Sequence, residues 1–419
     1  MRQTRTIVVA GGGIGGLAAA LAIANAGFRV VVLERATQLA EAGAGIQLSP
    51  NAGHALASLG LAQEVAAAST EIESLEIRSG HPGRRITKMP LGARAKTKYG
   101  QPYQVIHRAD LLEILAAKVR AHGEIDLQLG AELVEFGVHA NGTTVLAQTP
   151  TRSYETRGLA LIAADGVRST VRGLMPGGSP VVHSGRIAWR AVIKADDAPI
   201  GLPRDGVGLW IGPDAHLVHY PIRGGETINI VAIVKDNWDS EGWSERGDRE
   251  WIEARFRRWA PVARATLEAA PHWLKWPLLT VNPSGTWVAG SVALLGDAAH
   301  GMLPFLAQGG AMAIEDAVVL GRLVAASPDD PAAVLSTYES ARKPRVRRAW
   351  RAAKATGDLY HMRGISGMIR DAGMEVMGGR GLLARYDWIF GWRDAAASAK
   401  SAGRATPFSA HPRGSGDPA

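Results

Sequence analysis

The sequence predicts an α/β (α+β) protein in which a Rossmann-type dinucleotide-binding domain is interleaved with a β-sheet domain and followed by C-terminal helices. Three observations carry this prediction. The first 34 residues have the pattern of a strand, a glycine-rich turn, a helix and a second strand. Residues from about 178 to 290 show strand patterns, and a buried strand followed by long helical stretches comes after residue 291.

The N-terminal βαβ unit predicts a dinucleotide site. Its strands span residues 6–10 and 29–33, and its Ala/Leu-rich helix spans residues 13–25. Glycines in the turn permit a tight bend, a close approach of the backbone to a pyrophosphate, and close packing of the helix on the strand. Unpaired N–H groups and the helix dipole then face the phosphates. The glycines concerned are Gly11, Gly13, Gly15 and Gly16.

An acidic residue follows the second strand where a ribose is expected. Glu34 lies 18 positions after Gly16, and its carboxylate can accept hydrogen bonds from the ribose hydroxyls of an adenosine. Its neighbour Arg35 belongs to the same expected nucleotide-binding set. The unit by itself leaves NAD and FAD as alternatives, because both cofactors contain the adenosine half.

The composition is that of a globular protein with a sizeable core. The chain has 419 residues, of which 46% are hydrophobic and 21% charged. No apolar run reaches the ~18–20 residues of a membrane span, and the βαβ unit uses the apolar stretch that a signal peptide would need. Because the chain has no cysteine, disulfides and thiolate metal sites are excluded, and no metal is expected. We therefore expect a cytoplasmic protein, and the sequence leaves its oligomeric state open, a homodimer included.

The net charge of +8 does not by itself indicate a nucleic-acid partner. Basic residues cluster at residues 255–258 and 342–351, and in the second cluster Arg342, Arg345 and Arg348 follow helical spacing. This spacing predicts a solvated helix face, and no nucleic-acid-binding motif accompanies it. The positive charge is compatible with anionic small-molecule ligands.

The pattern along the chain predicts interleaved regions. Residues 80–101 are rich in Gly, Pro, Arg and Lys, which predicts a mobile surface loop. The sequence contains only one GxGxxG unit, so a second nucleotide would bind without a Rossmann domain of its own. We expect residues 1–177 to form the nucleotide-binding region, with substrate-side segments inserted at about 72–104, and residues 178–290 to form a β-sheet substrate domain. Residues 291–393 return to the nucleotide domain and add C-terminal helices. Residues 394–419 are expected to be a disordered tail.

Two later motifs narrow the choice of cofactor. Asp165 begins an Asp-Gly-Val-Arg-Ser stretch after a buried strand, and Asp297 lies within Leu-Gly-Asp-Ala-Ala-His. The second motif continues into Gln308, Gly309, Gly310 and the Glu-Asp-Ala run at residues 315–317. Together with the N-terminal glycines, these motifs resemble the three-part fingerprint of the single-component FAD-dependent aromatic hydroxylases, which are flavoprotein monooxygenases.

The resemblance implies FAD as the cofactor and NADH or NADPH as the co-substrate. It implies that Asp165 serves the pyrophosphates, that Asp297 binds a ribityl hydroxyl, and that the helix beginning near Gly309 directs its positive end at the flavin. The matching segments span about residues 5–393. Further expected FAD contacts are Gly45, Ile46 and Gln47 in a loop that starts at Gly43, Arg108 before a helix, and the backbone of Leu133.

Within this family, the chain is similar to the salicylate, 3-hydroxybenzoate and 6-hydroxynicotinate hydroxylases, in particular at residues 102–108, 215–221, 306–309 and 386–392. In such relatives the first histidine of a His-x-x-x-Tyr-Pro run activates the substrate hydroxyl and the tyrosine contacts the ring, which points to His216 and Tyr220. The implied reaction is the hydroxylation of a phenolic or hydroxypyridine carboxylic acid by O2 through a C4a-hydroperoxyflavin.

A histidine suits this chemistry because a deprotonated phenol has a more electron-rich ring. A histidine near its reference pKa can take the phenolic proton at neutral pH. On a strand, His216 and Tyr220 share one face and His219 points to the other. His219 and His300 are the alternative bases.

Two other functions stay open from the sequence. One is a flavin-dependent reductase or halogenase on the same fold, although the Trp-x-Trp-x-Ile-Pro run typical of halogenases is absent. The other is a flavin-binding sensor, which would bind FAD without oxidising NADH in response to an aromatic acid. The sequence does not specify the acid, the ring position, an accompanying decarboxylation, or NADH versus NADPH.

Overall fold

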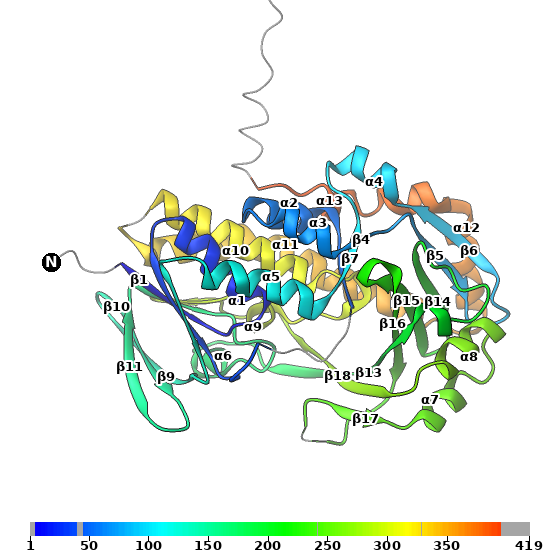
Figure 1. Cartoon of the computed structure of the whole chain (residues 1–419), viewed down its shortest axis with the longest axis horizontal. Helices are drawn as coiled ribbons and strands as arrows, with labels where there is room; N and C mark the ends of the chain where they lie inside the picture. Colours follow the sequence, from blue (N-terminus) through cyan, green and yellow to red (C-terminus); the bar gives the residue numbers. More distant parts are fainter. Residues whose placement is uncertain (1–4, 40–44, 241, 328, 395–419) are drawn as a thin grey trace, which may run out of the picture.

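The computed structural model describes residues 5–39, 45–240, 242–327 and 329–394. The described residues form a six-stranded sheet and an eight-stranded sheet. The two sheets lie toward opposite ends of the molecule (Figure 1). The long helices α10 (Gly309–Ala326) and α11 (Pro331–Tyr360) extend from the first sheet toward the second. The predicted combination of a Rossmann-type unit, a further β-sheet region and C-terminal helices is confirmed.

The six-stranded sheet contains the βαβ unit. Strand β1 pairs in parallel with β2 and with β12, and β12 pairs in parallel with β20. Helix α1 (Ile14–Asn25) is almost wholly buried, so both the helix and the strands read as apolar runs. In spatial order the strands are β19 (Val288–Ala289), β20 (Val292–Leu294), β12 (Ala160–Ala163), β1 (Thr6–Ala10), β2 (Arg29–Glu34) and β8 (Ile125–Leu129).

The eight-stranded sheet joins segments that are far apart in the sequence. Strand β5 pairs in parallel with β14, so a strand from the N-terminal region extends the sheet formed by residues beyond 180. In spatial order the strands are β17 (Glu245–Gly247), β18 (Trp273–Val281), β13 (Val181–Lys194), β16 (Thr227–Lys235), β15 (Ala215–Ile222), β14 (Val207–Gly212), β5 (Ser74–Ser79) and β6 (Arg85–Pro90).

The prediction of a mobile surface loop at residues 80–101 is wrong. This segment contains the edge strand β6 and helix α4 (Gly92–Tyr99). The physical reason is a sparse set of apolar side chains hidden among its charged residues, since Ile86, Met89 and Tyr99 are all buried. Helix α12 (Gly364–Ala384) packs along β6 and covers it on the outside.

The remaining elements connect the two large sheets. Three-stranded sheets are formed by β11 (Ser153–Gly158), β10 (Gly142–Gln148) and β9 (Glu132–His139), and by β3 (Gly45–Leu48), β7 (Gln104–His107) and β4 (Thr70–Glu71). The segment at residues 50–68 forms two helices with a break at Gly60, whose φ is +75°. The other helices are α2 (Pro50–Ser58), α3 (Ala62–Ala68), α5 (Arg108–Arg120), α6 (Thr170–Leu174), α7 (Arg249–Phe256), α8 (Pro261–Glu268), α9 (Asp297–His300), α13 (Asp387–Phe390) and the short η1 (Ala195–Asp197), η2 (Arg223–Gly225) and η3 (Pro304–Leu306).

The prediction that the arginines of α11 form a solvated helix face is also wrong. Arg342 is buried and forms ion pairs with Glu315 at 2.8 Å and Asp316 at 2.6 Å. Arg345 pairs with Glu315 at 2.7 Å, and only Arg348 of the three is exposed. The reason is the acidic pair on the facing helix α10, which takes two of the cations out of water.

Most of the tail predicted to be disordered, residues 394–419, lies outside the described residues. Its first member, Asp394, is described, and it is buried with its carboxylate 2.9 Å from Arg322 Nε. The packed part of the chain therefore includes Asp394.

We predict that Arg342→Met lowers the free energy of unfolding by about 3–5 kcal/mol, because it leaves two buried carboxylates without their cation. Urea unfolding followed by far-ultraviolet circular dichroism measures this. The control is Arg351→Met, at an exposed position of the same helix, which should change the free energy by no more than about 0.5 kcal/mol. Equal effects of the two substitutions would contradict the structural importance of the Arg342 ion pairs.

Candidate flavin and substrate site

The turn between β1 and α1 requires glycine at two positions. Gly11 has φ +102°, and a Cβ there would collide with the carbonyl oxygen of Ala164. A Cβ at Gly16 would collide with the carbonyl oxygen of Gly11. By contrast, nothing lies within 4 Å of a Cβ built on Gly13, so open space lies beside the start of α1. This arrangement leaves room for a pyrophosphate at the N-terminus of the helix.

Glu34 is fixed at the carboxyl end of β2. Its carboxylate accepts hydrogen bonds from the N–H groups of Gly12 at 2.6 Å and Ala36 at 2.8 Å. Arg35 beside it is exposed. The carboxylate is thus held next to the glycine turn, as a ribose-binding role requires.

The fold brings the separate motifs together around this turn. A Cβ on Gly11 would lie 3.0 Å from the Cα of Asp165, and one on Gly15 would lie 3.2 Å from Leu295. A Cβ on Gly309 would lie 3.8 Å from Asp297 Oδ1. The predicted cofactor residues of three distant segments therefore surround one region.

Two carboxylates in this region are suited to bind a polar cofactor. Asp165 is half-buried, and its Oδ2 accepts from the N–H of Val171 at 3.1 Å. Its Oδ1 is buried and has no hydrogen-bond partner within the described ranges, and burial raises the pKa of the carboxyl. Asp297 is exposed although its neighbours Gly296 and Ala298 are buried. Both groups fit a bound FAD, which would satisfy the unpaired oxygen and cover Asp297.

Other predicted cofactor residues differ in what they offer. The Gln308 side chain is buried and donates to Ser49 Oγ at 2.9 Å, so it holds the start of α10 to the start of α2. Gly310 lies against Ile46, since a Cβ there would be 2.9 Å from Ile46 Cδ1. Leu133 is buried on β9, and Arg108, the first residue of α5, is half-buried. Gly43 lies outside the described residues, and the expected loop is a strand, β3, from Gly45 onward.

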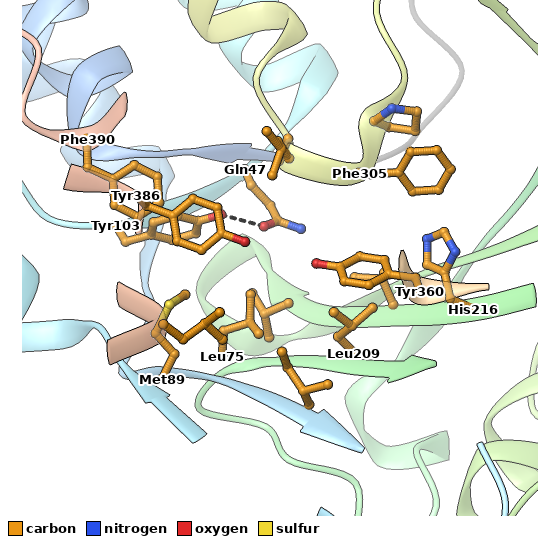
Figure 2. Close-up of a pocket in the computed structure, with 17 residues that line it drawn as sticks. Gln47, Leu75, Met89, Tyr103, Leu209, His216, Phe305, Tyr360, Tyr386 and Phe390 are labelled. Carbon is orange, nitrogen blue, oxygen red and sulfur yellow. Dashed lines mark hydrogen bonds between the residues drawn. The ribbon is translucent and has the colours of Figure 1, made fainter. Parts of the chain in front are cut away.

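A cavity lies between β3, η3 and the eight-stranded sheet. The space between its walls is about 630 Å³, with the open solvent at its mouth included. Its walls are mainly aliphatic and aromatic, and Figure 2 shows the hydroxyl groups of Tyr360 and Tyr386 pointing toward one another into it. The aromatic lining residues are Tyr103, Phe305, Tyr360, Tyr386 and Phe390.

Gln47 lines this cavity, although the sequence assigned it to the cofactor. The Tyr103 hydroxyl donates to Gln47 Oε1 at 2.6 Å (Figure 2). Because the carbonyl oxygen is engaged, the amide N–H groups of Gln47 are the part left for a ligand. Sequence reasoning missed this role, and it also missed Tyr103 and Tyr360 as cavity residues.

His216 and Tyr220 share one face of β15 but differ in position. His216 lines the cavity together with Val218. Tyr220 is buried beside Gly45, where a Cβ would collide with its ring, and it is not among the described residues that line the cavity. The sequence predicted that both side chains face one pocket. Among the described residues, His216 lines this cavity, whereas the Tyr220 ring packs against Gly45.

The alternative bases point elsewhere. His219 lies on the opposite face of β15 under Gly208, and burial lowers its pKa to about 3. The ring of His300 is buried with Nε2 2.6 Å from Asp316 Oδ2. His300 therefore belongs to the ion-pair cluster between α10 and α11.

His216 contacts a second histidine that sequence reasoning missed. His216 Nδ1 lies 2.9 Å from His361 Nε2, and His361 directly follows α11. Burial, His361 and the positive charge of Arg186 hold the pKa of His216 well below its ordinary value. Burial chiefly, with Arg186, lowers the pKa of His361 to about 4. The expectation of a histidine near its reference pKa is therefore wrong, and both rings are neutral at pH 7.

Comparisons with known proteins agree with this geometry. A family model described as an FAD binding domain matches residues 3–353. This chain belongs to that FAD-binding family. Among its relatives, a 3-hydroxybenzoate 6-hydroxylase of Polaromonas naphthalenivorans is 34% identical over 92% of this chain and 96% of its own length. A 3-hydroxybenzoate 6-hydroxylase 1 of Aquipseudomonas alcaligenes is 36% identical, with 91% and 96% covered.

Solved structures share the whole fold. Klebsiella pneumoniae HpxO complexed with FAD and uric acid superposes with a TM-score of 0.81 at 26% identity and covers 92% of this chain and 96% of its own. A salicylate hydroxylase substrate complex has a TM-score of 0.80 at 23% identity, covers 96% of this chain and 98% of its own, and supports the fold alone. The sequence-based assignment to the FAD-dependent aromatic hydroxylases is confirmed.

Two further observations concern only the described ranges. None of the helices there is both long and apolar enough to cross a bilayer. In the same part of the chain, no three His, Cys, Asp or Glu side chains are grouped so that they could hold a metal ion.

We predict that Asp297→Ala weakens FAD binding by about 1.5–3 kcal/mol, because a ribityl hydroxyl would lose a charged acceptor. The dissociation constant can be measured from flavin fluorescence after preparation of the apoprotein. Glu155→Ala, which removes an exposed carboxylate on β11, serves as the control and should leave the constant unchanged. Unaltered FAD affinity in Asp297→Ala would remove this residue from the cofactor site.

Proposed function

We propose that this flavoprotein hydroxylates a single-ring phenolic or hydroxypyridine carboxylic acid, with O2 and with NADH or NADPH as the reductant. The observation that carries the proposal is the cavity with His216 in its wall, between the flavin-side segments β3 and η3 and the eight-stranded sheet. When bound, FAD would supply the hydride acceptor for the nicotinamide and the chemistry that activates oxygen. The eight-stranded sheet, with the segment at residues 72–104, forms the substrate side of the enzyme.

The cavity selects a flat apolar ring. Leu75, Leu209 and Met89 form one wall and face the aromatic side chains of the other elements (Figure 2). Burial of a ring against such a surface stabilises the complex through the hydrophobic effect and through edge or offset contacts between rings.

A substrate carboxylate would be bound by neutral donors. The described residues that line the cavity include neither Lys nor Arg. The amide of Gln47 and the hydroxyl groups of Tyr360 and Tyr386 are the polar groups opposite the apolar wall. A hydrogen bond from a neutral donor to a carboxylate is charge-assisted and needs no buried cation. Relatives named for hydroxybenzoates support an acid of this class.

His216 is the group that we assign to the substrate hydroxyl. It is the one imidazole among the described lining residues, and a ring carbon ortho or para to an ionised hydroxyl is a better nucleophile toward activated oxygen. His216 therefore promotes the reaction by favouring the phenolate form of the substrate. Tyr220 would then support the flavin-side strand at Gly45.

A panel of hydroxybenzoates and hydroxypyridine carboxylates tests the proposal. A substrate should stimulate NADH or NADPH oxidation and yield a hydroxylated product, and its carboxamide analogue should bind more weakly. A flavin reductase would give reduced substrate without oxygen incorporation. A flavin-binding sensor would show no stimulation by any acid in the panel.

We predict that His216→Ala retains FAD and flavin reduction but lowers hydroxylation about 100-fold or more, because the phenolate loses its stabilising group. The ratio of product to NADH consumed measures the coupling, and the difference should appear as hydrogen peroxide. His219→Gln, on the other face of the same strand, is the control and should keep the ratio. An unchanged ratio in His216→Ala would exclude His216 from the chemistry.

We predict that Gln47→Leu raises KM for the acid about tenfold or more with a smaller change in kcat, because one donor to the carboxylate is lost. Tyr103→Phe should raise KM less, since it removes only the hydrogen bond that orients the Gln47 amide. Initial rates at varied substrate concentration give both constants. A fall in kcat alone would contradict a carboxylate-binding role.

A further inference from the structure

The contact between His216 and His361 belongs to a longer chain of hydrogen bonds. Arg186, on β13, donates from Nε to His361 Nδ1 at 3.4 Å. Its Nη2 donates to Asp358 at 2.8 Å, and its guanidinium lies 5.5 Å from the centre of the Phe305 ring. These three contacts hold the guanidinium in place, and the Arg186 side chain as a whole is only 15% exposed.

The direction of these hydrogen bonds follows from one fixed member. A guanidinium is always a donor and never an acceptor. His361 Nδ1 must therefore accept, and the neutral ring of His361 carries its proton on Nε2. That N–H donates to His216 Nδ1, which must accept in turn. A neutral imidazole has one N–H, so the proton of His216 is on Nε2.

We propose that Arg186 and His361 fix the tautomer of His216, so that Nε2–H faces the substrate and donates a hydrogen bond to its phenolate oxygen. His361 and Arg186 are then positioning residues of the reaction. The substrate binds as the phenolate, and its proton leaves to the buffer rather than to His216. The nature of the ligand rests on the proposed function, whereas the tautomer of His216 does not.

The surroundings of His216 support a donor role. The groups that face it are Tyr360, Phe305 and His361, and none is a carboxylate that could accept from Nδ1. The charged groups lie one step further, where Arg186, Arg255, Asp358 and Asp214 surround His361. The positive charge of Arg186 is therefore transmitted through two polarised rings toward the cavity, where it favours an anion.

The tautomer can be measured in the substrate-free holoenzyme. Histidine labelled with ¹⁵N in both ring positions gives long-range ¹H–¹⁵N correlations that distinguish a protonated from an unprotonated nitrogen, and His216→Gln assigns the signal. We expect His216 to show a protonated Nε2 and an unprotonated Nδ1. Protonation at Nδ1 would overturn the proposal, whichever compound the enzyme hydroxylates.

Two variants of His361 reverse or preserve the hydrogen bond. His361→Gln keeps an N–H donor for His216 Nδ1, whereas His361→Glu supplies an acceptor and should move the His216 proton to Nδ1. FAD content and thermal unfolding show whether each variant is folded. The probe is 3-hydroxy-4-nitrobenzoate, whose phenolate absorbs visible light.

With wild type and His361→Gln, we expect the probe to bind as the coloured phenolate at a pH where the free probe is largely neutral. With His361→Glu, affinity for the phenolate should fall about tenfold or more, and the neutral form should bind. Phenolate binding that is equal in the Gln and Glu variants would overturn the proposal. A probe that binds to none of the proteins would instead count against the proposed substrate class, and the ¹⁵N signals would still decide the tautomer.

Discussion

A buried cluster of charges between α10 and α11 is the interaction on which the rest of the molecule depends. Arg342 forms ion pairs with Glu315 and Asp316, and Arg345 forms one with Glu315. The His300 ring is hydrogen-bonded to Asp316. Burial alone would raise the pKa of Asp316, but Arg342 and His300 outweigh it and keep the pKa below its ordinary value. Ion pairs of this kind stabilise only while complete, because each partner removed leaves a charge without compensation.

The same cluster positions the cofactor and substrate regions. Asp316 accepts from the N–H of Gly296, the residue before Asp297, at 3.2 Å. Glu315 accepts from Asn51 at 2.8 Å, and Asn51 also donates to Gln308 at 3.0 Å. The acidic pair of α10 therefore fixes the turn that presents Asp297 and the loop that leads to Phe305. Its role is to hold these segments in register rather than to contact a ligand.

The cavity, in contrast to this cluster, is lined by uncharged side chains. Its described lining contains no Lys or Arg, and the nearby histidines are neutral because burial and Arg186 lower their pKa. We infer that the positive charge of Arg186 acts on the cavity through the rings of His361 and His216. A neutral donor can bind a carboxylate or a phenolate and release it again, whereas a buried cation would bind either anion more strongly. The basic residues that give the chain its net charge of +8 are thus absent from the described lining of the cavity.

The sequence by itself determined the nucleotide-binding unit, the family and the strand that carries His216. These features depend on local patterns, since a glycine such as Gly11 is required by the backbone beside it and strand alternation places His216 opposite His219. Only the tertiary structure decided the surroundings of these residues. Arg342 is buried because an acidic pair lies on another helix, and the segment at residues 80–101 is ordered because a sheet edge and α12 cover its few apolar side chains. His361, 145 residues from His216, fixes the hydrogen bonding of that ring through a contact that no local pattern specifies.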